Sequence, residues 1–165
     1  GATGAIGSAA VQILKANGSH VAATCRPEHF TLVKELGADD LIDYTAANVT
    51  DYPGPFDFVF DAVGKSRFQT LAPTLTRRGI YLSSELGPHG ENIYLPLATR
   101  LRPGKRVIFP VPTDIKKSIH DMAAMLAAGA FRPIIDRHYP LSEARAAYEY
   151  VLTGEKLGNV ALDID

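Results

Sequence analysis

The sequence has little of what would place the protein in a membrane, on a nucleic acid or in an oxidising compartment. Its 165 residues include a single cysteine, Cys25, so no disulfide can form within the chain and a zinc site built from several cysteines is excluded. No apolar run approaches the roughly 20 residues that span a bilayer. Because 17 basic residues nearly balance 18 acidic ones, we expect neither a membrane nor a nucleic acid as partner. The single cysteine is typical of a reducing compartment, so we expect a cytoplasmic location.

Several catalytic motifs are also missing. The five histidines are scattered, with no pair at i, i+4 and no carboxylate at a ligand-like spacing, so we expect no metal site. None of the seven tyrosines has a lysine four residues later, which excludes the Tyr-x-x-x-Lys pair of short-chain reductases. Gly64-Lys65-Ser66 is similar to the end of a P-loop, but Val59 stands where its leading glycine is required. We assign no catalytic residue, because no side chain stands out as a general acid or base.

What is present is an alternation of strand-like and helix-like segments in a chain that is 46% hydrophobic, enough to bury a core. The predicted helices cover residues 5–16, 27–36, 67–76, 115–128 and 142–152. The predicted strands cover residues 21–25, 41–44, 56–61, 80–83, 106–109, 133–139 and 159–164. We expect residues 84–104 to be mostly irregular, with a helical turn near 97–101, and the second half of 45–55 to be a loop. The alternation predicts an α/β fold, a Rossmann-type doubly wound parallel sheet.

A glycine-rich turn opens the chain. Ala2-x-Gly4-x-x-Gly7 is a variant of the dinucleotide-binding fingerprint in which alanine replaces the first glycine. Gly4 lets the backbone approach a pyrophosphate and Gly7 lets the following helix pack on the sheet. The N–H groups of Ala5 and Ile6, at the start of that helix, can bind anionic oxygen. By itself the pattern fits a strand-to-helix turn without a ligand equally well.

The residues about 20 positions beyond the glycines favour a ligand. Cys25-Arg26 ends the next predicted strand, where an acidic residue would bind the ribose hydroxyls of NAD. An arginine there can hold a 2′-phosphate with two hydrogen bonds, so the sequence predicts NADP(H) rather than NAD. The alternative is a solvated loop arginine, and Glu28 supports it. Ser83-Ser84, at the end of a later strand, fits a position facing the same cofactor crevice.

Motifs along the whole chain resemble those of the medium-chain dehydrogenase/reductase superfamily. Within it, the resemblance is to the quinone oxidoreductase-like branch, often labelled zinc-binding alcohol dehydrogenase. The stretches that carry it are GATGAIGSAAVQ, ELGAD followed by IDY, FDFVFDAVG, PIIDR and GEKLGNV. The resemblance implies a nicotinamide cofactor held along the carboxyl ends of the strands. The implied cofactor-binding residues are Thr3, Gly4, Ala5, Ile6, Gly7, Thr24, Cys25, Arg26, Tyr44, Ala62, Val63, Gly64, Ser83, Ser84, Phe109 and Lys156.

The resemblance also implies a domain organisation. Residues 1–130 would be the NAD(P)-binding Rossmann domain, and residues 131–165 the return segment of a GroES-like catalytic domain. The rest of that domain, with any zinc ligands and most substrate contacts, would lie outside the given sequence, as would the strand expected before Gly1. No zinc is therefore expected in this chain.

The implied function is the cofactor-binding portion of an NADPH-dependent oxidoreductase that delivers hydride to a quinone, an enone or an aldehyde. The alternative is a truncated nucleotide-binding or interaction module without turnover. In the family the resemblance points to, the strand near Val107–Phe109 lies at a sheet edge, and pairing of two such edges would give a homodimer.

Overall fold

The computed structural model describes residues 1–52 and 54–164. Pro53, in the predicted loop before Phe56, and Asp165, at the end of the predicted return segment, lie outside the described residues. The chain divides into two compact units, each with its own hydrophobic core. The terminal unit contains Ala2–Leu41 and Lys116–Asp165, and the central unit contains Gly1 and Ile42–Ile115.

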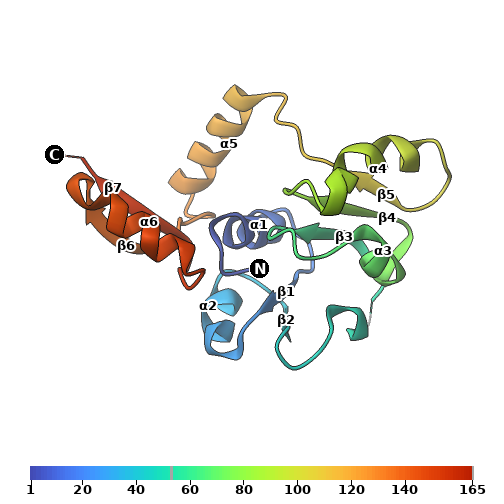
Figure 1. Cartoon of the computed structure of the whole chain (residues 1–165), viewed down its shortest axis with the longest axis horizontal. Coiled ribbons are helices and arrows are strands. Elements are labelled where there is room, and N and C mark those ends of the chain that lie inside the picture. The colour runs from blue at the N-terminus through green and yellow to red at the C-terminus, as the bar shows by residue number, and fades with distance from the viewer. Residues whose placement is uncertain (53, 165) are drawn as a thin grey trace. The chain divides into compact units, whose positions relative to one another are not determined.

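The terminal unit combines the start of the chain with its C-terminal segment (Figure 1). Its elements are α1 (Ala5–Ala16), β1 (Ala22–Cys25), α2 (Phe30–Glu35), α5 (Ile115–Ala127, which begins at the unit boundary), β6 (Ile135–Pro140), α6 (Ala144–Leu152) and β7 (Asn159–Asp163). β1 pairs with β2 (Asp40–Asp43), through which the chain enters the central unit, and β6 pairs in parallel with β7. The helix predicted at residues 5–16 is confirmed, and Gly18, at a φ of +77°, turns the chain after it.

A small apolar core and one side-chain amide connect the two parts of the terminal unit. Val11 of α1, Cys25 of β1 and Val33 of α2 are buried together, and Ile134 from the C-terminal segment packs against this cluster. The buried Gln12 side chain donates to the Arg132 carbonyl at 3.1 Å and accepts from the Arg132 N–H at 2.9 Å. Both polar ends of the amide are thereby satisfied, as a buried amide requires. The C-terminal segment is therefore bound directly to α1.

The central unit contains one parallel sheet in the order β3-β4-β5. Its elements are β3 (Phe56–Asp61), α3 (Phe68–Leu71), β4 (Leu75–Ser83), α4 (Glu91–Arg100) and β5 (Arg106–Ile108). Asp61 pairs with Ser83 and Leu82 pairs with Ile108, so the three strands end at the same edge of the sheet. The parallel pairing confirms the predicted α/β class. The described strands form three separate sheets.

The helix predicted at residues 67–76 is largely wrong. Its α-helical part is limited to α3, a 3-10 turn follows at Ala72–Thr74, and β4 already begins at Leu75. Pro73 lies in that turn and cannot donate a backbone hydrogen bond, which ends the α-helix. Leu75 is buried and pairs with Phe56, and the register then shifts, so that Arg77 and Arg78 bulge outward and are exposed.

The segment 84–104, predicted to be mostly irregular, contains the helix α4. Pro96 lies inside α4, where it removes one backbone donor. The first turn is nevertheless held by tertiary contacts, because the buried Glu91 carboxylate accepts from Arg67 at 2.6 Å and Asn92 is almost fully buried. Thr99 also donates its hydroxyl to the Leu95 carbonyl at 2.8 Å. These contacts outweigh the intrinsic penalty of a proline in a helix.

Smaller differences concern the ends of elements. β5 ends at Ile108 rather than 109, β6 runs from Ile135 to Pro140 rather than from 133 to 139, and α6 begins at Ala144. The helix predicted from residue 142 starts later because a 3-10 turn, Leu141–Glu143, precedes α6, which has no side-chain cap. Within residues 1–52 and 54–164, no helix combines the length and apolar character that crossing a bilayer requires.

Candidate functional site

The glycine turn at the start of the terminal unit leads directly into α1. Gly4 occupies the N-cap position in an extended conformation, and its hydrogen side chain offers no acceptor to the helix. No side chain caps this end and no acidic residue lies in the first turn. The first N–H groups of α1, including those of Ala5, Ile6 and Gly7, therefore have no side-chain partner from the cap. Such an end attracts anionic groups through its N–H donors and the helix dipole.

The end of β1 lies beside this turn. The Ala2 N–H donates to the Thr24 carbonyl at 3.0 Å, which attaches the beginning of the turn to the strand. Cys25 is only 1% exposed and its side chain packs in the core, so only its backbone can face a ligand. Arg26 follows in an exposed position, 3.8 Å from the Glu28 carboxylate across a loose ion pair. The structure thus brings Thr24 and Arg26 to the same end of the unit as the glycines.

Lys156 belongs to a loop that also reaches the turn. Its ammonium donates to the Gly158 carbonyl at 2.6 Å, and the Gly158 N–H donates to the Thr3 carbonyl at 2.7 Å. Gly4 and Gly158 form an isolated parallel bridge. Lys156, 152 positions from Gly4 in the sequence, is therefore connected to the glycine turn through the backbone of Gly158.

In the central unit, Asp61 organises the turn that follows β3. This buried carboxylate accepts three backbone hydrogen bonds, from Val63 at 3.0 Å, Gly64 at 2.8 Å and Ser66 at 2.9 Å. Gly64 has a φ of +73°, a conformation that glycine adopts without steric cost. The predicted cofactor residues Ala62, Val63 and Gly64 are therefore held in one shape by a charged acceptor.

The predicted cofactor residues at the ends of β4 and β5 lie at the same edge of the sheet as the turn after β3. Ser83 is fully buried and accepts from the Glu85 N–H at 3.2 Å, while the Ser84 N–H donates to the Asp61 carbonyl at 3.3 Å. The Ser84 hydroxyl is buried and has no hydrogen-bond partner in the described structure. Phe109 is half-buried and directly follows Ile108, the last residue of β5.

The remaining predicted cofactor residue is Tyr44, which directly follows β2 and has an exposed side chain.

Tyr81 lies beneath this edge. Its side chain is fully buried, and its hydroxyl donates to the Ser66 carbonyl at 3.2 Å and lies 3.4 Å from the Asp61 carboxylate. Burial raises the pKa of Tyr81 to about 12, and the negative charge of Asp61 contributes to the shift. The phenol therefore stays protonated at ordinary pH and serves as a structural donor.

The predicted residues thus fall into two groups, one on each unit. Sequence reasoning missed three residues that build them: Asp61, Asn92 and Gly158. Asn92 donates its side-chain amide to the Glu85 carbonyl at 2.8 Å and so holds the loop after β4. Asp61 could have been found as an acidic residue at a strand end two residues before a Val-Gly turn, a common turn-capping arrangement. The contacts of Gly158 and Asn92 depend on tertiary structure, and no local signal points to them.

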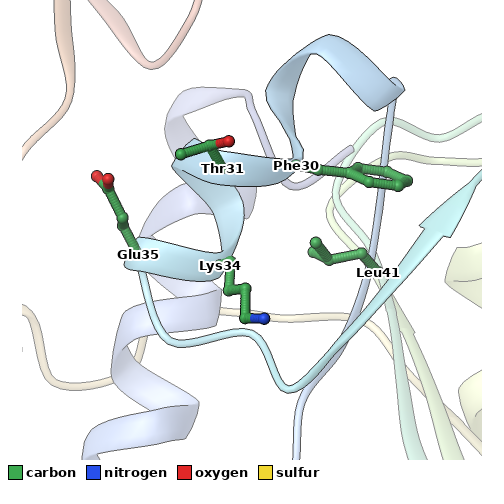
Figure 2. A pocket seen from close by; sticks show the side chains of 5 residues that line it. All are labelled: Phe30, Thr31, Lys34, Glu35 and Leu41. Atoms are coloured by element: carbon green, nitrogen blue, oxygen red, sulfur yellow. The ribbon is translucent and has the colours of Figure 1, made fainter.

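A pocket of about 440 Å³ lies elsewhere on the terminal unit, between α2 and β2. Figure 2 shows Phe30 of α2 projecting over Leu41 of β2, and Thr31, Lys34 and Glu35 of the same helix complete the lining. The pocket is open and contains none of the predicted site residues. We therefore place the candidate site at the glycine turn, where donors converge, and not in this hollow.

The donor set does not fit a metal ion. Among residues 1–52 and 54–164, no three His, Cys, Asp or Glu side chains come together as a metal-binding group. We therefore derive no zinc-dependent step from this chain.

Comparisons with known proteins add a family to this geometry. A family model described as zinc-binding dehydrogenase matches residues 36–162. The human protein "NAD(P)H oxidoreductase RTN4IP1, mitochondrial" is 31% identical over 185 residues, covering 99% of this chain and 46% of that protein. The chloroplastic quinone-oxidoreductase QR1 of Triphysaria versicolor is 28% identical over 168 residues, covering 98% of this chain and 50% of its own. The chain spans about half the length of the curated relatives it matches.

A solved structure shares the fold. The Escherichia coli quinone oxidoreductase complexed with NADPH aligns with a TM-score of 0.80 and 21% identity. The alignment covers 99% of this chain and 55% of that one. At this identity the likeness shows the fold alone.

Proposed function

The chain belongs to the zinc-binding dehydrogenase family, and on this premise we propose that it is the cofactor-binding part of an NADPH-dependent oxidoreductase. The observation that carries the proposal is the uncapped start of α1 in the glycine turn, with Arg26 at the end of the neighbouring strand. The relative's name gives NAD(P)H and oxidoreductase, and the solved neighbour is described as bound to NADPH. Both agree with a nicotinamide dinucleotide at this turn.

The turn would receive the pyrophosphate. The N–H groups of Ile6 and Gly7 are donors at a positive helix end, and the absence of an acidic residue in that turn avoids repulsion of the phosphates. Lys156, tied to the same turn through Gly158, adds a positive charge nearby. We propose that Thr3 to Gly7, Thr24 and Lys156 hold this part of the cofactor.

Arg26 would select NADPH over NADH. Its guanidinium is exposed, and its contact with the Glu28 carboxylate, at 3.8 Å, is too long for a hydrogen bond. A 2′-phosphate could displace this weak contact and accept two charge-assisted hydrogen bonds. Tyr44 and the backbone of Cys25 are further proposed contacts of the adenosine half.

The edge of the central sheet would hold the nicotinamide half. The proposed contacts are Ala62, Val63, Gly64, Ser83, Ser84 and Phe109, of which Ser84 has a hydroxyl without a hydrogen-bond partner in the described structure. The bound nicotinamide would supply hydride to a quinone, an enone or an aldehyde. The protein's own residues would orient the ring and exclude water, and no residue of this chain is assigned as a general acid or base.

A titration of the protein with NADPH and with NADH tests this proposal. We expect binding of NADPH and weak or undetectable binding of NADH. Arg26→Gln should weaken NADPH binding roughly ten- to hundredfold, because it removes hydrogen bonds to a charged phosphate, and should leave NADH unchanged. Arg145→Gln is the matched control, since Arg145 is an exposed arginine that contacts Glu149.

Two results would contradict the proposal. Equal affinity for both dinucleotides, unchanged by Arg26→Gln, would remove the NADPH assignment. No binding of either would favour the alternative, an interaction module without turnover.

We further propose a homodimer formed through β5. In the described sheet β5 lies at an edge, next to β4 only, and Ile108 is 40% exposed. An unpaired edge is a template for a second strand, although Pro110 and Pro112 shorten the available ladder. Light scattering should give twice the chain mass, and Ile108→Lys should shift it toward the monomer. A monomeric wild-type protein would contradict the dimer.

The proposed location is a reducing compartment, the cytoplasm. The single, buried Cys25 supports it. Two relatives carry "mitochondrial" and "chloroplastic" in their names, which describes those proteins.

A further inference from the structure

The C-terminal segment contacts the glycine turn at Gly158. Its N–H donates to the Thr3 carbonyl at 2.7 Å, and it bridges to Gly4 in the manner of a neighbouring parallel strand. Thr3 and Gly4 immediately precede the first N–H groups of α1. The orientation of those donors therefore depends on where Gly158 lies.

The position of Gly158 depends in turn on β6. The Asn159 N–H donates to the Ile134 carbonyl at 2.8 Å, and the Asn159 side-chain amide donates to the same oxygen at 3.1 Å. On the other side of Gly158, the Leu157 N–H donates to the Asp136 carboxylate at 3.3 Å. The loop is thus fixed both before and after the glycine.

Tyr150 of α6 fixes the Asp136 carboxylate. Its hydroxyl donates to the same carboxylate oxygen that accepts from Leu157, at 2.6 Å. The Arg137 guanidinium lies 3.8 Å over the centre of the Tyr150 ring, a cation–π contact that holds the ring in place. The hydrogen bond to Asp136 raises the pKa of Tyr150, so the hydroxyl remains a donor throughout the ordinary pH range.

We propose that Tyr150 and Asp136 are positioning residues of the dinucleotide-binding turn, acting through Leu157 and Gly158 on Thr3 and Gly4. They touch no cofactor, and their effect passes along the hydrogen bonds just described. The consequence for cofactor affinity rests on the proposed function, whereas the mechanical link to the turn does not. A segment attributed by resemblance to the catalytic domain would then set the geometry of the cofactor-binding domain.

Tyr150→Phe tests the link with the smallest change, because it removes only the hydroxyl. Tyr148→Phe is the matched control on the same helix, since Tyr148 is 73% exposed. We expect Tyr150→Phe to speed amide hydrogen exchange in residues 155–159 and also in residues 1–8, and to weaken NADPH binding about three- to tenfold. In the active enzyme the KM for NADPH should rise while kcat is retained. Asp136→Ala, which removes the acceptor shared by Tyr150 and Leu157, should give the same pattern, and Tyr148→Phe should match the wild type.

The two readouts separate this inference from the proposed function. Unchanged exchange in residues 1–8 of Tyr150→Phe would overturn the inference, whatever the protein binds. If residues 1–8 of Tyr150→Phe exchange faster than those of the wild type, but the wild type binds neither NADPH nor NADH, the link would be supported and the proposed function contradicted. Faster exchange with unaltered NADPH affinity would also overturn the positioning role.

Discussion

Gly158→Ala is expected to destabilise the terminal unit by roughly 3 to 5 kcal/mol and to abolish cofactor binding. Gly158 has a φ of +65°, and a Cβ built there would lie 2.3 Å from the Ile134 carbonyl oxygen. The left-handed conformation costs an alanine about 1 kcal/mol, and forcing the backbone apart adds a few kcal/mol more. Any such shift also moves the N–H that holds Thr3. Urea unfolding and a NADPH titration measure the two effects.

Gly154→Ala is the matched control for this prediction. Gly154 has a φ of +75°, nearly the same conformation, but a Cβ there would meet nothing within 4 Å. It should lose only the conformational part, about 1 kcal/mol, and keep its cofactor affinity. Equal losses at the two glycines would show that the contact with Ile134 is unimportant.

Asp61→Ala should cost the central unit roughly 3 to 5 kcal/mol, because it leaves three backbone donors and the Tyr81 hydroxyl without their charged acceptor. The turn that carries Ala62 to Gly64 would lose its shape. Urea unfolding gives the stability, and a spectroscopic titration gives the pKa of Tyr81. That pKa should fall from about 12 but stay raised, since burial is the larger cause.

Asp57→Ala is the control on the same strand. Its carboxylate is exposed and accepts a hydrogen bond from the Thr76 hydroxyl at 3.1 Å. We expect a change within about 0.5 kcal/mol. A stability loss for Asp61→Ala no larger than this, or an unchanged pKa of Tyr81, would contradict the role assigned to Asp61.

The parts of the fold that could be predicted from sequence are those with a strong local signal. α1 and α5 have apolar residues at helical spacing and a glycine after their last turn, and both were found nearly to the residue. β3 is a dense run of aromatic and β-branched residues, and its bounds are confirmed. Several motifs that occur in order along the chain predict the family, and the match over residues 36–162 confirms it.

What could not be predicted depends on contacts between distant residues. α4 contains a proline and follows glycines, so local propensity argues against it, yet its first turn is held by Arg67 and by the buried Asn92. The sequence Arg77-Arg78-Gly79 is typical of a turn, but it lies inside β4. The strand already begins at Leu75, which is buried in the core of the central unit. The contact between Thr3 and Gly158 joins opposite ends of the chain. Periodicity and turn chemistry contain no information on such pairs.

Backbone amide chemical shifts of isotope-labelled protein during a NADPH titration show whether the glycine turn binds a dinucleotide. We expect the amides of Ala5, Ile6 and Gly7, together with those flanking Arg26, to shift with saturation, and NADH to move them much less. Saturable binding that leaves the amides of residues 3–7 unchanged, or no binding at all, would show that the glycine turn is not the dinucleotide site.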